Sequence, residues 1–189
     1  MGLISDWIWK KQTEFVEKHG SLPEFFSKKA ENHKTIDANY RSKHSGLKFE
    51  PAYGALVYTE LLFGLAEHSG IYIGNKKIIN LDGKGRITKV SCNQFTENIS
   101  TFNHEIYVPC YDGEVISIGF YRAGSNAEEK LSQGRKYNLL FDNCHQFSAG
   151  CITGDFENSS NFLSFVKEDF KRALGGESIV WRKWDWKNN

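Results

Sequence analysis

Residues 70–81 read GIYIGNKKIINL: two short apolar runs, 70–73 and 77–81, lie on either side of a turn signal at Gly74-Asn75. Short runs rich in isoleucine predict β strands, and a tight turn between two of them predicts an antiparallel hairpin. The Gly-Asn order is weaker than Asn-Gly for a type I′ turn, but it places the centre of the hairpin near residue 74. This centre predicts that residues 68 and 80 are cross-strand neighbours, to within one position.

The segments on both sides of this hairpin continue the pattern. Further strands are predicted at 55–58, at 87–90 after a turn at 82–85, and at 105–110. Helices are predicted over residues 5–18, 21–32, 127–133 and 160–174, with another that begins at Cys144 after a short strand at 137–141. Helices followed by antiparallel strands and then by more helices are typical of an α+β protein.

The composition is that of one globular domain with appended helices. Of its 189 residues, 40% are hydrophobic and 14% aromatic, enough to fill a sizeable core. A formal net charge of +1 gives no general attraction to nucleic acid. The sequence lacks both a signal peptide and the roughly 20 apolar residues that span a bilayer, so we expect a cytoplasmic protein, with export as an effector left open.

The segment 139–147, LLFDNCHQF, places a cysteine where a nucleophile gains most from its surroundings. Asn143 is a favoured N-cap residue, and Gln146 follows it by three residues, as in a variant of the capping box. Cys144 is therefore predicted in the first helical turn, where backbone N–H groups and the positive end of the helix dipole stabilise a thiolate. The same N–H groups can bind the oxyanion of an acyl intermediate.

A cysteine nucleophile also needs a base that is held by a third group. His68 lies just before the strand at 70–73, and Asn80 lies near the end of the returning strand. We therefore predict that His68 accepts the proton of Cys144 and that Asn80 orients the imidazole through its side-chain carbonyl, as in papain-like enzymes. His145 adjoins the nucleophile but is rotated from it by about 100° on a helix, so a rim or surface position is predicted.

The remaining cysteines, Cys92, Cys110 and Cys151, are interpreted as packing residues in a reduced protein. Cys144 and Cys151 would be two helical turns apart, about 10 Å by rise alone, which is too far for a disulfide. The His and Cys residues do not have the spacing of zinc ligands, so neither a metal nor an organic cofactor is expected.

Two separated motifs carry a family resemblance. The first is EHSGIYIG at 67–74, followed by NLDG at 80–83; the second is YNLL at 137–140, running into Asn143-Cys144 and then CITG at 151–154. Together they resemble the lecithin retinol acyltransferase family, a circularly permuted branch of the NlpC/P60 papain-like superfamily in which the histidine precedes the cysteine. The resemblance covers roughly residues 51–154. It implies a permuted papain-like fold, with an antiparallel sheet packed on the helix that carries Cys144, and a thioester intermediate on that cysteine.

The chain departs from the family pattern at two places. Many animal members have a second histidine where this chain has Asn80, although other papain-like enzymes use Asn or Gln there. Members often carry Glu-His where this chain has His145-Gln146, which bears on the substrate class. The resemblance divides the chain into an N-terminal helical extension (1–45), a catalytic domain (46–176) and an aromatic, basic tail (177–189).

These features predict a cysteine-dependent acyltransferase or hydrolase acting on an ester or amide, with lipid as the substrate class that the resemblance suggests. Two alternatives stay open: an NlpC/P60-like peptidase or amidase, and a binding module that has kept the fold without catalysis. The expected partner is a small-molecule, lipid or peptide acyl substrate, not nucleic acid, and the oligomeric state is left open. The tail at 177–189 could contact a membrane interface, but its tryptophans are more readily interpreted as covering the core.

Overall fold

The computed structural model describes residues 50–61, 66–97, 104–114, 116–133 and 143–188. The chain divides into two compact units, Met1–Leu47 and Lys48–Asn189, and everything described below belongs to the second. The helices predicted over 5–18 and 21–32 and the strand predicted at 137–141 lie outside the described residues.

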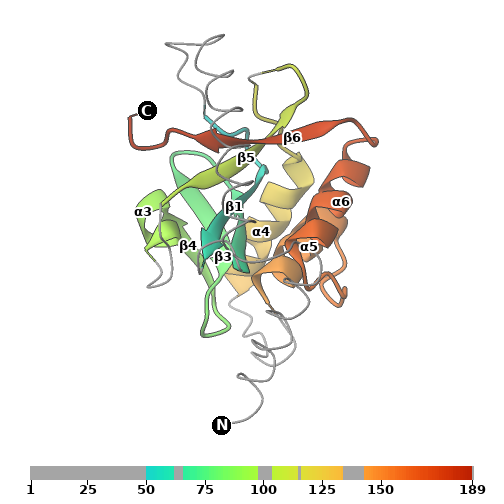
Figure 1. The fold of residues 1–189 in the computed structure, drawn as a ribbon. Helices are drawn as coiled ribbons and strands as arrows, with labels where there is room; N and C mark the ends of the chain where they lie inside the picture. The colour runs from blue at the N-terminus through green and yellow to red at the C-terminus, as the bar shows by residue number, and fades with distance from the viewer. Residues whose placement is uncertain (1–49, 62–65, 98–103, 115, 134–142, 189) are drawn as a thin grey trace, which may run out of the picture. The chain divides into compact units, whose positions relative to one another are not determined.

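A six-stranded antiparallel sheet forms the centre of the second unit, with the order β4-β3-β2-β1-β5-β6 (Figure 1). The strands are β1 (Leu56–Leu61), β2 (Ala66–Tyr72), β3 (Lys77–Leu81), β4 (Ile87–Ser91), β5 (Ile106–Tyr111) and β6 (Ile179–Trp184). The first four strands make a meander, and β5 and β6 then extend the sheet on the other side of β1. The α+β class and the strands predicted between residues 55 and 110 are confirmed.

The β2–β3 hairpin turns at Asn75 and Lys76. Both residues have left-handed backbone angles, with φ of 52° and 54°. The backbone N–H of Lys77 donates to the carbonyl oxygen of Gly74 at 2.9 Å, which closes the turn around these two central residues. Positive φ at both central positions is the signature of a type I′ turn, the form that matches the twist of a hairpin. The ladder pairs on either side of this turn place the centre of the hairpin at residue 75, one residue later than the sequence suggested.

This shift changes the register around the candidate base. The β2–β3 ladder consists of the pairs Ile71↔Ile79 and Tyr72↔Ile78. In that register Asn80 falls opposite Gly70, so His68 and Asn80 are diagonal neighbours two positions apart. The prediction that they oppose each other to within one position is wrong, because it placed the turn near residue 74.

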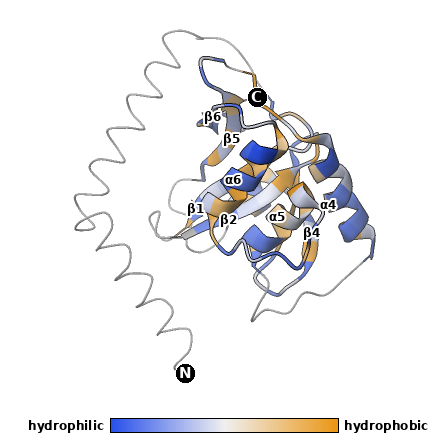
Figure 2. Cartoon of the chain, turned by 90° about the vertical axis from the view of Figure 1, so that its right-hand side faces the viewer, coloured by the Kyte–Doolittle hydropathy of each residue, from blue (hydrophilic) through white to orange (hydrophobic). Residues whose placement is uncertain are grey.

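Four helices pack on the sheet within the described part of the chain. They are α3 (Cys92–Thr96), α4 (Tyr121–Gln133), α5 (Cys144–Thr153) and α6 (Leu163–Ala173). Helices α4, α5 and α6 cover one face of the sheet and α3 lies on the other (Figure 1). The outward sides of α4 and α6 carry many hydrophilic residues (Figure 2), as expected for helices with one buried face. None of the helices in the described ranges has the length and apolar character that crossing a membrane requires.

Side chains alternate along the strands and so supply two separate core layers. One layer packs against α4, α5 and α6 and includes Leu56, Ile71, Ile79, Leu81, Phe147, Val166 and Phe170. The other packs against α3 and includes Val57, Tyr72, Ile78, Phe95, Val108, Trp184 and Trp186. The alternation decides where the functional residues of β2 point: Ser69 shares the face of Ile71, and His68 shares the face of Tyr72.

Helix α6 buries fewer of its aromatic residues than its periodicity predicts. Val166 and Phe170 are fully buried, but Phe162 is 40% and Phe165 53% exposed, and their two rings lie 5.7 Å apart. The predicted start at residue 160 is wrong. The helix begins at Leu163, and this residue takes the inward position together with Val166 and Phe170, which turns the two phenylalanines towards solvent.

Residues 179–184, which the sequence placed in a tail, form a strand of the sheet. Strand β6 pairs with β5 along its whole length, from Ile179↔Tyr111 to Trp184↔Ile106. Trp184 and Trp186 are 2% and 8% exposed and lie in the core layer of α3. The predicted boundary at residue 176, between the catalytic domain and the tail, therefore separates β6 from the strand with which it pairs.

Candidate active site

Cys144 is the first residue of α5, as the sequence predicts. The side-chain oxygen of Asn143 accepts hydrogen bonds from the backbone N–H groups of His145 and Gln146, at 2.8 and 3.0 Å. The side-chain oxygen of Gln146 accepts in return from the backbone N–H of Asn143 at 3.0 Å, which completes the capping box. The box fixes the start of the helix, so the half-buried Cys144 lies at the positive end of the helix dipole.

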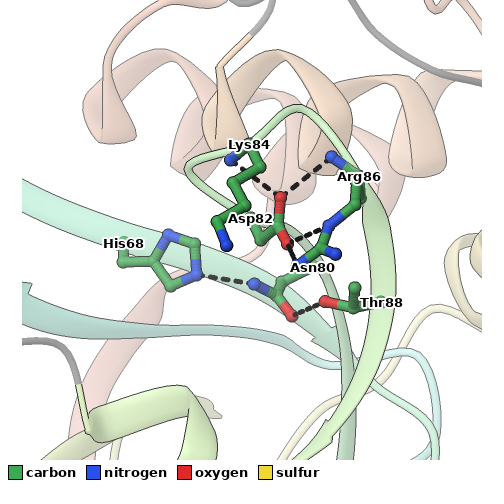
Figure 3. A network of polar contacts seen from close by, with 6 residues as sticks. All are labelled: His68, Asn80, Asp82, Lys84, Arg86 and Thr88. Atoms are coloured by element: carbon green, nitrogen blue, oxygen red, sulfur yellow. Dashed lines mark hydrogen bonds and ion pairs between the residues drawn. The ribbon is translucent and has the colours of Figure 1, made fainter.

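His68 on β2 and Asn80 on β3 are in direct contact, as Figure 3 shows. The side-chain nitrogen Nδ2 of Asn80 lies 2.8 Å from Nε2 of His68. Both residues are buried, at 8% and 5% exposure, and the imidazole packs against the ring of Phe95 with centroids 4.9 Å apart. The pair is therefore held by a hydrogen bond on one side and by an aromatic ring of α3 on another.

Gly70 makes the room for this diagonal contact. A Cβ atom on Gly70 would lie 2.7 Å from Cγ2 of Ile78 and 3.2 Å from Cβ of Asn80. Any larger residue between His68 and Asn80 would therefore push the asparagine away from the imidazole. The β2–β3 ladder also ends at the pair Ile71↔Ile79. Beyond that pair, the hydrogen bond between the side chains of His68 and Asn80 connects the two strands.

The amide of Asn80 faces His68 with its nitrogen and not with its carbonyl oxygen, so the predicted contact through the oxygen is wrong. The oxygen Oδ1 instead accepts a hydrogen bond from the hydroxyl of Thr88 on β4, at 3.3 Å. A donor opposite Nε2 matches a neutral imidazole whose proton is on Nδ1. Because the Thr88 hydroxyl can donate or accept, it can also hold the amide when it is turned over and presents its oxygen to a protonated Nε2.

The thiol of Cys144 interacts with His68 and with the neighbouring Ser69. Burial raises the pKa of Cys144, but the positive charge and hydrogen bond of His68, and hydrogen bonds from the backbone and hydroxyl of Ser69, outweigh this effect and lower the pKa below that of an ordinary thiol. The structure thus brings together the three residues that the sequence analysis singled out. A thiolate is the nucleophilic form of cysteine, so this environment favours reaction at Cys144.

A second polar cluster, not predicted from the sequence, lies next to the nucleophile. The hydroxyl of Ser69 lies 2.9 Å from Nδ1 of His145, 2.9 Å from the hydroxyl of Ser148 and 3.1 Å from the carbonyl oxygen of Cys144. The Ser148 hydroxyl donates to the same carbonyl at 2.9 Å. Two sequence signals could have found this cluster: Ser69 shares its strand face with Ile71, and Ser148 follows Cys144 by one helical turn.

The predicted rim position of His145 is wrong. His145 is 7% exposed, and its Nδ1 lies 4.0 Å from the sulfur of Cys144. The reason is that α5 is covered on most of its sides, because nearly all residues from 145 to 152 are buried. A rotation of about 100° from Cys144 therefore turns the imidazole towards β2 instead of towards solvent.

The thiol pKa values of the other three cysteines are raised, whereas that of Cys144 is lowered. Cys92, Cys110 and Cys151 are buried and not disulfide-bonded. Burial raises the pKa of Cys92 and Cys110 to about 11 and also raises the pKa of Cys151. These thiols are protonated at neutral pH, which matches their predicted role in packing and makes Cys144 chemically distinct.

No protein-family model, curated protein or solved structure matches the chain. The resemblance to the lecithin retinol acyltransferase family therefore stays a prediction from two sequence motifs. Within the described ranges, no three His, Cys, Asp or Glu side chains gather as ligands for a metal ion.

Proposed function

We propose that this chain is a cysteine-dependent acyltransferase or hydrolase of permuted papain-like fold, acting on an ester or amide through a thioester on Cys144. One observation carries the proposal: a cysteine at a capped helix start has its pKa lowered by His68, and His68 is held by Asn80. Together these features favour a thiolate on Cys144, which is the nucleophilic form of cysteine. The antiparallel sheet packed on α5 fits the proposed fold.

In the proposed reaction the sulfur of Cys144 attacks the carbonyl carbon of the substrate, and the thiol proton passes to His68. The carbonyl oxygen becomes an oxyanion, and the backbone N–H of Cys144 can bind it, because the first N–H groups of a helix have no carbonyl partner within the helix. The N–H groups of His145 and Gln146 already donate to Asn143. The tetrahedral intermediate then expels an alcohol or amine, which takes the proton from His68 and leaves a thioester. An incoming alcohol, amine or water returns a proton to His68 as it releases the acyl group from Cys144.

The surface next to Cys144 favours a substrate with an apolar part. The Asn143 side chain donates to the backbone carbonyl of Asn161 at 3.2 Å, and the exposed ring of Phe162 follows directly in the chain. Phe165 extends this aromatic surface along α6. An acyl chain derived from a lipid would bury apolar area against these rings.

Alkylation by iodoacetamide across pH, with mass mapping of the labelled cysteine, tests the proposal. We expect Cys144 to label rapidly well below about pH 8, while Cys92, Cys110 and Cys151 label slowly in the same sample and serve as internal controls. His68→Ala should slow the labelling of Cys144 about tenfold or more at about pH 7. A Cys144 thiol that reacts like an ordinary one would instead support the non-catalytic binding module.

Substrate class is tested next on the same protein. Nitrophenyl esters of increasing acyl length and a panel of peptide amides should be compared with Cys144→Ala as the blank. Turnover that rises with acyl length would support the lipid-derived substrate. Turnover of the peptides alone would instead favour the peptidase or amidase.

A further inference from the structure

Ser69 contacts more of the candidate active site than any packing role requires. It follows His68 in β2, is fully buried, and its hydroxyl reaches the carbonyl oxygen of Cys144, the imidazole of His145 and the hydroxyl of Ser148 within 3.1 Å. A buried side-chain polar atom generally needs one hydrogen-bond partner, and the Ser69 hydroxyl has three within reach. Here it forms the junction between β2 and the first turns of α5.

The alternation of β2 gives His68 and Ser69 complementary access to the nucleophile. His68 packs against Phe95 on the α3 side of the sheet, and Ser69 contacts residues of α5 on the other side. Two consecutive residues of one strand therefore act on Cys144 from different directions. A small shift of α5 relative to β2 would change both interactions at once.

One arrangement of the hydroxyl protons makes three of the four short contacts of the cluster hydrogen bonds. The hydroxyls of Ser69 and Ser148 both donate to the carbonyl oxygen of Cys144. The oxygen of Ser69 is then available to accept from Nδ1–H of His145, 2.9 Å away. When Cys144 is ionised, the Ser69 proton has a second acceptor on the same residue, the sulfur, to which both the hydroxyl and the backbone N–H of Ser69 contribute hydrogen bonds.

We propose that Ser69 is a positioning residue for the nucleophile: its hydroxyl ties the start of α5 to β2 through Cys144 and His145 and holds the sulfur where His68 can take its proton. This inference rests on the proposed function, because it assigns the residue to the same reaction. It adds a fourth position to Cys144, His68 and Asn80, and it gives the buried His145 the task of orienting the Ser69 hydroxyl.

The test compares the pH profile of Cys144 alkylation in Ser69→Ala with that in the unmodified chain. We expect the profile of Ser69→Ala to move to higher pH and the rate at about pH 6.5 to fall about 3- to 10-fold, since the thiolate loses a hydrogen-bond donor. With a nitrophenyl ester as probe, kcat should fall more than KM rises. A profile equal to that of the unmodified chain would overturn the inference.

Ser117→Ala is the matched control. Ser117 is also a buried serine, 6% exposed, and its hydroxyl accepts from the backbone N–H of Ala52, away from Cys144. Its substitution should lower the melting temperature without moving the alkylation profile. If Ser117→Ala moves the profile as far as Ser69→Ala does, the effect of Ser69 is one of general stability and the inference fails.

A pair of isosteric variants keeps the test decisive if Ser69→Ala does not fold. Ser69→Thr and Ser69→Val have the same shape and both suit a strand, but only threonine keeps the hydroxyl. The alkylation profile of Ser69→Thr should lie at lower pH than that of Ser69→Val; equal profiles would overturn the inference.

His68→Ala distinguishes failure of the proposed function from failure of the role of Ser69. If it leaves Cys144 unchanged, the proposed function fails, and if it slows Cys144 while the Thr and Val variants agree, only the role of Ser69 fails.

Discussion

Asn80 can meet His68 with either end of its amide group, and the choice sets which nitrogen of the imidazole carries a proton. With Nδ2 facing Nε2 at 2.8 Å, the neutral imidazole keeps its proton on Nδ1. In that tautomer Nδ1, the ring nitrogen left for Cys144, cannot accept the thiol proton. His68 acts as the base when the amide is turned over, so that its oxygen accepts from Nε2–H and Nδ1 carries the lone pair. Thr88 is the residue that can hold the amide in both orientations, because its hydroxyl both donates and accepts.

Replacement of Thr88 tests this interpretation. Thr88→Val keeps the shape of the side chain but removes the hydrogen bond to Asn80, so we expect kcat for an ester probe to fall about 2- to 10-fold, the range of one net hydrogen bond. Thr88→Ser keeps the hydroxyl and should retain most of the activity. Asn80→Ala should cost more than Thr88→Val. Equal rates for the Val and Ser variants would show that the hydroxyl does not hold the amide.

The sequence allowed prediction of the residues whose roles depend on local signals. Asn143 and Gln146 mark the helix start, and with it the position of Cys144. The burial of His145 and the contacts of Ser69 depend on how α5 lies against β2, which no local pattern encodes. These contacts are set by tertiary packing, so sequence reasoning placed His145 on the surface and passed over Ser69.

At the scale of single elements, the capping box of α5 should support both the fold and the reactivity of the thiol. Asn143→Ala removes the acceptor for the N–H groups of His145 and Gln146, so we expect a loss of about 1–2 kcal/mol in the free energy of unfolding. The helix start should also loosen, and alkylation of Cys144 near neutral pH should slow about 3- to 10-fold. Chemical denaturation and the alkylation rate, measured on the same sample, check both effects.

Helix α3 provides a matched control, because it begins with the same kind of box. The Ser91 hydroxyl accepts from the N–H of Gln94, and the Gln94 side chain accepts from the N–H of Ser91. Ser91→Ala should cost about 1 kcal/mol of stability and leave Cys144 alkylation unchanged. If both variants slow alkylation to the same extent, the effect follows from stability and not from the start of α5.

The turn between β3 and β4 should make stability depend on pH. Oδ1 of Asp82 accepts from the N–H groups of Lys84 and Arg86, and Oδ2 accepts from the Arg86 guanidinium at 2.8 Å (Figure 3). Burial alone raises the pKa of Asp82, but these hydrogen bonds and the charge of Arg86 outweigh it and lower the pKa. A lowered pKa means that the stabilisation is present above the unfolded pKa of about 4 and is lost as the pH falls below it.

Asp82→Asn should therefore destabilise the protein by about 1 kcal/mol at neutral pH, where the carboxylate is ionised. The difference between this variant and the unmodified chain should shrink as the pH falls below about 4, because protonation removes the same charge from Asp82. Urea denaturation at a series of pH values measures it. A difference that is constant over this range would mean that the charge of Asp82 contributes nothing.

Elements were easier to predict than their ends. The strand at 77–81 and the helix start at Cys144 match the structure because a turn signal or a cap marks each boundary. Helix α4 begins at Tyr121, earlier than the predicted start at 127. The prediction began too late because Gly124 is a weak helix former; in the structure it packs closely on Tyr53. Helix α3 was missed although its box at Ser91 and Gln94 resembles that of α5, since its five residues are too few for a periodic pattern.

For the whole molecule, the least predictable feature was the route of the chain through the sheet. The meander from β1 to β4 follows from short connections, but β6 returns from the end of the chain to pair with β5. The sequence of β6 has no clear period, because five of its six residues are only partly buried and Trp184 alone is buried. Such a strand resembles a tail until its partner is known.

Deletion of β6 tests whether it is part of the fold. Strand β5 registers with β1 at the single pair Tyr58↔Tyr107, whereas β6 holds it at each of its positions. A chain that ends at Glu177 also loses Trp184 and Trp186 from the core, and each tryptophan is worth about 3–5 kcal/mol against a total stability of about 5–15 kcal/mol. We therefore expect this chain to lose cooperative thermal unfolding and to aggregate through the exposed edge of β5, whose apolar residues Ile106, Val108 and Cys110 are otherwise fully buried. A chain that ends at Lys187 keeps the whole of β6 and should unfold like the full-length protein. If the chain ending at Glu177 unfolds cooperatively at the same temperature as the control, residues 178–189 are a detachable tail and the pairing of β6 with β5 is not required for the fold.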